Sequence, residues 1–275
     1  MQRSSSASTL PLHRDLNLLY VLSLLVALGM TAASVLGLVF PEHVYPTEEL
    51  RQSFLANEVV NLAIGLPVLL ASMWFTRRGK LLGLLFWPGA TLYALYNHIA
   101  YVRAMPLGWA LFLHLALVSL STYTTIALVA SIDGVAVQGR LRGRVPERFA
   151  AGVLVGLGVL FLAFVLGTAG GAIVNGTPFA ETQLAVQVAD STVIPAWIIG
   201  GVLLWRRRPL GYVGGAGLLF QGSMLFIGLI AVMLLQPLLT GAPFALVDVI
   251  VIAAMGLVCF VPFGLYVRGI LSART

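Results

Sequence analysis

The chain has 275 residues, of which 59% are hydrophobic and only 9% are charged. Soluble globular proteins carry about 25% charged residues, so this composition excludes soluble enzymes, soluble nucleic-acid-binding proteins and disordered chains. The single cysteine, Cys259, also excludes an intrachain disulfide, a CxxC redox pair and a thiolate metal cluster.

Eight apolar runs follow one another along the chain, and each is long enough to cross about 30 Å of hydrocarbon as a helix. The sequence therefore predicts an all-α integral membrane protein, an eight-helix transmembrane bundle that forms a single domain over residues 1–275. The expected spans are 16–40, 54–75, 81–103, 106–130, 148–174, 183–205, 210–236 and 243–270.

The first run needs a separate test, because Arg3 and Arg14 precede it as they would in a signal peptide. Its apolar length of about 25 residues exceeds the core of a signal peptide and favours a retained helix. Cleavage would leave seven spans in the same orientation.

The basic residues predict the orientation of the bundle. Fourteen of the sixteen lysines and arginines fall on one side if the eight spans alternate, and only Arg51 and Arg103 fall on the other. Cytoplasmic loops carry the excess of positive charge. We therefore expect a multi-pass protein of the plasma membrane with both termini in the cytoplasm. The fourteen residues are Arg3, Arg14, Arg77, Arg78, Lys80, Arg140, Arg142, Arg144, Arg148, Arg206, Arg207, Arg208, Arg268 and Arg274.

An internal repeat is one interpretation of the second and sixth spans. Pro67 and Pro195, and likewise Gly83 and Gly211, are separated by the same 128 residues. Four spans between the copies would give a parallel 4+4 repeat, a pattern found in transporters. The alternative is that tryptophans and arginines recur at any membrane interface. The repeat halves would be 16–130 and 148–270, joined by a basic cytoplasmic linker, 131–147.

Glycine spacing makes a further prediction about packing. Pairs of glycines four residues apart let helices approach closely in membranes. Such pairs occur at Gly152/Gly156, Gly167/Gly171 and Gly211/Gly215.

Ionisable side chains within the spans indicate a functional site, since each costs about 2.5–3.5 kcal/mol to insert and is usually paired or functional. The predicted orientation places all of them in the outer third of the bilayer, where they would share one polar cavity that opens to the outside. They are Glu58, His98, His114, Asp190 and Asp248. With their polar neighbours they predict a ligand-binding set of Glu58, Asn61, Tyr93, Asn97, Tyr101, Gln187 and Asp190.

The leading functional hypothesis is a small-molecule or ion transporter, or a related membrane receptor. Asp190 and Glu58 would bind a cation or proton that arrives from the outer side, while Asn61, Asn97 and Tyr101 would orient the ligand. No lysine lies within a span, which excludes a retinal Schiff base, and no HExxH, Walker or GxSxG motif occurs.

Two alternatives stay open at this point. A tetrahedral zinc site of His98, His114, Glu58 and Asp190 would make the protein an intramembrane enzyme that acts on a lipid or isoprenoid, and haem ligation by the two histidines is a variant. A non-catalytic subunit would instead use its polar residues to bind a protein partner, a second copy of the chain or lipid headgroups. Membrane lipids are expected partners in every case, and nucleic acid in none.

Overall fold

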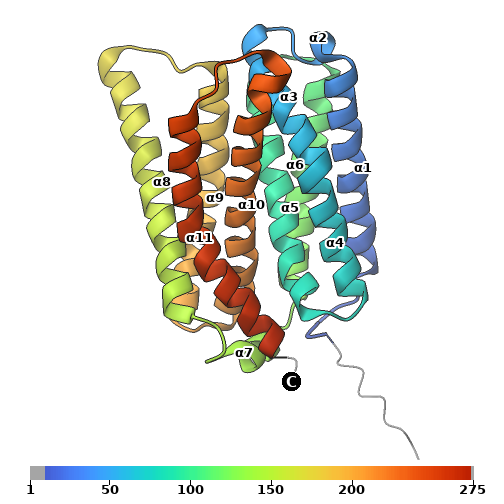
Figure 1. The fold of residues 1–275 in the computed structure, drawn as a ribbon. Coiled ribbons are helices and arrows are strands. Elements are labelled where there is room, and N and C mark those ends of the chain that lie inside the picture. The colour runs from blue at the N-terminus through green and yellow to red at the C-terminus, as the bar shows by residue number, and fades with distance from the viewer. Residues whose placement is uncertain (1–9, 274–275) are drawn as a thin grey trace, which may run out of the picture.

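The computed structural model describes residues 10–273, which form a bundle of long helices without a β-strand (Figure 1). The helices are α1 (Asn17–Val39), α2 (Pro41–Val44), α3 (Glu48–Val60), the π-helical turn η1 (Asn61–Gly65), α4 (Leu66–Arg77), α5 (Leu81–Ala104), α6 (Trp109–Ser131), α7 (Gly134–Leu141), α8 (Glu147–Asn175), α9 (Glu181–Trp205), α10 (Pro209–Thr240) and α11 (Leu246–Ser272).

Seven of the helices are long and apolar enough to cross a membrane: α1, the continuous α3–η1–α4, α6, α8, α9, α10 and α11. The remaining expected span is α5, which is 24 residues long but carries polar residues such as Asn97 and His98. Most of α5 is buried against other helices. Because little of its surface would contact lipid, polar side chains on α5 can be paired within the bundle. The chain is thus an all-α membrane bundle that crosses the membrane several times.

The second expected span begins earlier than the apolar run indicates. Helix α3 starts at Glu48, because the Thr47 side chain accepts a hydrogen bond from the Leu50 amide at 3.3 Å and caps the helix. The segment 41–53, between the first two expected spans, therefore contains α2 and the first turns of α3.

Helices α5 and α10 form the centre of the bundle. Helix α5 packs against α4, α6, α9 and α10, whereas α10 packs against α3, α5, α7, α9 and α11. The two central helices approach most closely at Gly89 and Gly217: a Cβ added to Gly89 would overlap the Gly217 carbonyl oxygen. Small residues allow such close contact between membrane helices.

The two ends of the bundle differ in charge. One end, here the α2 end, holds α2 and the connections α8–α9 and α10–α11 at the top of Figure 1. The other, the α7 end, holds α7, the α4–α5 and α9–α10 turns and the described C-terminal residues. Twelve of the fourteen cations expected on one side belong to segments at the α7 end, while Arg3 and Arg274 lie outside the described residues.

Glu147 anchors the packing at the α7 end. Its carboxylate lies 2.6 Å from Nε of Arg207 and accepts a hydrogen bond of 2.6 Å from the Tyr212 hydroxyl. The contacts join the start of α8 to the start of α10. The Arg207 backbone has a φ of 53°, and it is the only described residue other than glycine with a positive φ.

Candidate binding cavity

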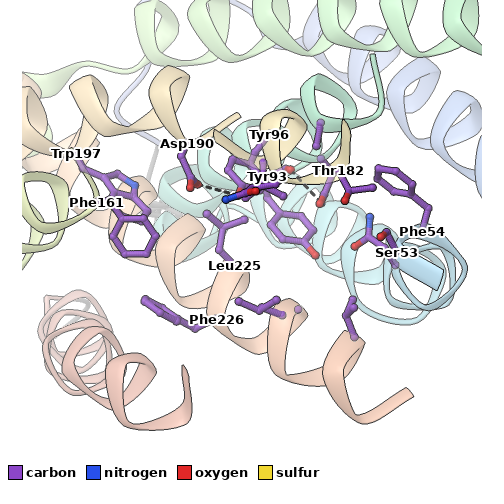
Figure 2. Close-up of a pocket in the computed structure, with 18 residues that line it drawn as sticks. Ser53, Phe54, Tyr93, Tyr96, Phe161, Thr182, Asp190, Trp197, Leu225 and Phe226 are labelled. Atoms are coloured by element: carbon purple, nitrogen blue, oxygen red, sulfur yellow. Dashed lines mark hydrogen bonds between the residues drawn. The ribbon is translucent and has the colours of Figure 1, made fainter. Parts of the chain in front are cut away.

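A cavity of about 390 Å³ runs from the α2 end toward the middle of the bundle. Figure 2 shows the residues that line it. Its walls come from α3, α5, α8, α9 and α10. Polar groups reach it from α3, α5 and α9, and the residues that carry them are Ser53, Asn57, Tyr93, Tyr96, Asn97, Thr182, Gln183 and Asp190. We call this space the Asp190 cavity.

Asp190 is the only charged residue among the described residues that line the cavity. Its side chain is buried, at 7% exposure, and Oδ1 accepts a hydrogen bond of 2.9 Å from the Tyr96 hydroxyl (Figure 2). This bond joins α9 to the central helix α5. In an apolar environment, one hydrogen bond from a neutral donor offsets only part of the free-energy cost of burying an ionised carboxylate. A positive partner would therefore stabilise Asp190 further.

Aromatic rings make up much of the remaining wall. In Figure 2 the rings of Trp197 and Phe161 lie together beside the Asp190 end of the cavity, and their centroids are 5.6 Å apart at an angle of 81°. The Trp197 ring is held in place because its indole Nε1 donates to Oε1 of Gln221 at 2.8 Å. The six aromatic residues in the lining are Phe54, Tyr93, Tyr96, Phe161, Trp197 and Phe226.

Three of the seven expected ligand-binding residues line this cavity: Tyr93, Asn97 and Asp190. The Tyr93 hydroxyl lies against Gly228 of α10, where an added Cβ would be only 2.7 Å from the hydroxyl oxygen. The glycine therefore leaves room for the Tyr93 side chain in the cavity wall. Gln187 is on the same helix as Asp190 but turns toward α8, where its Nε2 donates to Oγ1 of Thr168 at 2.6 Å. It is not among the residues that line the cavity.

Glu58, Asn61 and Tyr101 belong to a second polar cluster, which is buried next to the cavity. Glu58 is 1% exposed and accepts a short hydrogen bond from the Tyr45 hydroxyl. Burial raises the pKa of Tyr45, as does the neighbouring Glu58, so this hydroxyl stays protonated and acts as the donor. Tyr101 lies beside Glu58 and accepts a hydrogen bond from Nδ2 of Asn61 at 3.5 Å.

The two histidines extend this cluster. The His114 ring stacks on Tyr101, with centroids 4.5 Å apart and planes 1° from parallel. Nδ1 of His114 lies 3.1 Å from Nδ1 of His98, so one nitrogen donates to the other. Nε2 of His98 is buried and has no hydrogen-bond partner among the described residues. The set Tyr45, Asn57, Glu58, Asn61, His98, Tyr101 and His114 is called the Glu58 network below.

Asn57 connects the Glu58 network to the cavity. Its side chain lines the cavity and donates to the Tyr101 hydroxyl at 2.9 Å. One helical turn further along, at Asn61, the chain enters the π-helical turn η1. Such turns are rare inside α-helices and often occur at functional sites.

The four residues expected as zinc ligands do not converge. Glu58 bonds to Tyr45, Asp190 bonds to Tyr96, and the two histidines bond to each other. Among residues 10–273 no group of three or more His, Cys, Asp or Glu side chains could hold a metal ion. Because the histidine nitrogens contact each other directly, a haem iron between them would also require the helices to separate.

The expectation of one cavity for all five ionisable residues is wrong in two respects. The Glu58 network is a buried hydrogen-bonded cluster outside the lining of the Asp190 cavity, except for Asn57, which belongs to both. Asp248 belongs to neither, since it is exposed in the first turn of α11.

Tyr45 and Tyr96, which donate hydrogen bonds to Glu58 and Asp190, were not singled out by the sequence pattern. Tyr45 lies outside every expected span, and Tyr96 is one of several tyrosines whose position is typical of a membrane interface. Phe161 and Phe226 are single aromatic residues in apolar runs, and no sequence signal distinguishes them from lipid-facing residues.

Comparison with protein-family models, with curated proteins and with solved structures found no match to this chain.

Proposed function

We propose that the protein crosses the plasma membrane eight times, with the α2 end outside and both termini in the cytoplasm. Seven helices have the length and apolarity of spans, and α5 lies among them along the same direction (Figure 1). The basic residues gathered at the α7 end support the cytoplasmic position of that end.

We also propose that residues 16–130 and 148–270 are two copies of one four-helix unit. The turns α4–α5 and α9–α10 support this interpretation. Gly79 and Arg207 are 128 residues apart, and both have positive φ, at 70° and 53°. The flanking hydrogen bonds correspond at the same offset, from the Lys80 amide to the Phe75 carbonyl at 3.0 Å and from the Arg208 amide to the Leu203 carbonyl at 2.9 Å.

Gly83 and Gly211 support the repeat in a second way. Each is the third residue of its helix, α5 or α10, and each packs against the end of the preceding helix. A Cβ on Gly83 would lie 2.5 Å from the Thr76 amide nitrogen, and a Cβ on Gly211 would overlap the Leu204 amide nitrogen. Both hairpins therefore turn in the same way at corresponding positions.

From this arrangement we infer that the protein is a small-molecule or ion transporter, or a related membrane receptor, with the Asp190 cavity as its ligand site. The observation that carries the inference is a 390 Å³ cavity between the two proposed halves, with a buried carboxylate in its wall. Helices α3 and α5 come from one half and α8, α9 and α10 from the other. Rocking of one repeat against the other around a fixed site is the usual mechanism of such transporters.

A ligand screen tests this proposal. A ligand that binds only the folded protein raises its stability by about 2.7 kcal/mol at a hundred times its Kd. Thermal unfolding of the detergent-solubilised protein should therefore identify stabilising compounds, and Asp190→Asn should abolish their effect.

Asp248→Asn is the matched control, because it removes a carboxylate from the same end of the bundle but outside the cavity. Compounds that stabilise the wild type and Asp190→Asn equally would argue against the site. Uptake of the active compounds into proteoliposomes would then separate a transporter from a receptor.

A further inference from the structure

We propose that the ligand of the Asp190 cavity is an organic cation, an amine or quaternary ammonium compound whose positive group lies beside Asp190. This inference rests on the proposed function and specifies the chemical class of the ligand.

The charge of the cavity is the first argument. The described lining contains one carboxylate and no lysine, arginine or histidine. Among the described residues, the only hydrogen bond to Asp190 comes from a neutral hydroxyl, that of Tyr96. A buried ionised carboxylate is costly unless it is paired with a positive group. Since the described lining supplies none, a cationic ligand is the partner that this site would favour, and an anionic ligand would be repelled.

The aromatic wall is the second argument. Six aromatic residues line the same space, and the Trp197–Phe161 pair lies on the Asp190 side of it, with Trp197 two helical turns from Asp190 on α9 (Figure 2). The faces of aromatic rings attract cations, with about 0.5–2 kcal/mol for each favourable contact, and rings combined in this way bind quaternary ammonium groups. The same rings also provide apolar contact for the body of an organic molecule.

Size and donor type exclude a bare metal ion as the preferred ligand. The volume of 390 Å³ falls in the range of about 300–1,000 Å³ that is usual for small-molecule sites. Hard metal cations require six or more oxygen ligands close together, whereas this wall presents mostly rings and aliphatic groups around one carboxylate. An organic cation needs only the one charge and the apolar surface.

Cysteine labelling with charged reagents tests the inference without knowledge of the natural ligand. Ala100 lines the cavity one helical turn from Tyr96, the donor to Asp190. Ala100→Cys in a Cys259→Ala background would be treated with a trimethylammonium-ethyl methanethiosulfonate and with its sulfonate-ethyl counterpart. In both cases the cysteine thiolate forms a mixed disulfide and methanesulfinate leaves.

The reference position is Leu107→Cys, in the α5–α6 connection at the α2 end, where the residue is 86% exposed. We expect the ratio of cationic to anionic labelling rates at Ala100→Cys to exceed the ratio at Leu107→Cys by roughly tenfold, because a nearby charge acts more strongly in a low-dielectric space. Asp190→Asn should remove this excess, and Asp248→Asn should preserve it.

The outcomes distinguish the inference from the function on which it rests. If the ratio of cationic to anionic labelling rates is the same at Ala100→Cys and Leu107→Cys, or if the excess at Ala100→Cys persists in Asp190→Asn, the inference of an organic cation is wrong. The cavity would still be accessible from solution. Failure of both reagents at Ala100→Cys, with normal labelling at Leu107→Cys, would overturn the open cavity and with it the inference. Gln183→Cys, another lining position, provides the same test if Ala100→Cys does not fold.

Discussion

Replacing Gly89 with alanine perturbs the contact between the central helices α5 and α10 at its closest point. The added methyl carbon would overlap the Gly217 carbonyl oxygen and lie 2.9 Å from Cδ1 of Phe220, while ordinary van der Waals contact begins at 3.4 Å. Relief of the Phe220 contact alone needs about 0.5 Å (from 2.9 to 3.4 Å), and relief of the backbone overlap at Gly217 needs more, so the two helices would have to move apart. Overpacking of this kind costs about 1–3 kcal/mol.

Gly167→Ala in α8 is the matched control, since no atom of the described residues lies within 4 Å of the added carbon. Both substitutions gain the same helix propensity, about 1 kcal/mol, so the difference between them isolates the steric cost. The free energy of unfolding in mixed micelles should be lower for Gly89→Ala than for Gly167→Ala by about 1–3 kcal/mol. Gly217→Ala should be milder, because its closest contact would be 3.3 Å, to the Leu85 carbonyl oxygen.

Equal stability of Gly89→Ala and Gly167→Ala would refute this packing of α5 against α10. The result bears on the site as well, because α5 carries Tyr96 and α10 carries Phe226 on facing walls of the Asp190 cavity.

Two further predictions concern buried carboxylates. Tyr45→Phe removes the donor to Glu58 and should lower the free energy of unfolding by about 1–3 kcal/mol, whereas Tyr123→Phe, at a position 71% exposed, should leave it unchanged. Equal free energies of unfolding for Tyr45→Phe and Tyr123→Phe would argue against a stabilising hydrogen bond between Tyr45 and Glu58. Glu147→Gln weakens the contact with Arg207 and should lower the unfolding temperature in detergent; an unchanged temperature at low and high salt alike would show that this ion pair does not stabilise the α7 end.

The spans were predictable because crossing hydrocarbon imposes a long apolar run on each helix. The expected boundaries agree with the helices to within a few residues at α1, α5 and α9. The start of α3 was missed because Thr47 and Glu48 are polar, and apolarity reports the membrane-embedded part of a helix rather than its capped end.

The side chains of the site were predictable in type but not in grouping. Depth along each helix follows from residue number, so Glu58, Asp190 and the histidines were expected at similar heights. Rotation about the helix axis depends on packing that the sequence does not display, and this is why Gln187 faces Thr168 while Asp190, on the same helix, faces the cavity.

Glycine spacing illustrates the same limit. The pair Gly167/Gly171 has the spacing of a close helix contact, yet an added Cβ at either position would meet nothing within 4 Å. The closest approach of the central helices uses Gly89 and Gly217, which are far apart in sequence, so no local spacing could indicate it.

Protection from cysteine labelling tests whether an organic cation occupies the Asp190 cavity. Ala100→Cys in the Cys259→Ala background would react with an uncharged methyl methanethiosulfonate at increasing concentrations of tetraethylammonium. We expect saturable slowing of this reaction, no slowing at Leu107→Cys, and loss of protection in Asp190→Asn. A labelling rate at Ala100→Cys that does not change with the concentration of the cation would show that the cation does not bind in the cavity. Protection that persists in Asp190→Asn would show that the carboxylate does not hold the cation.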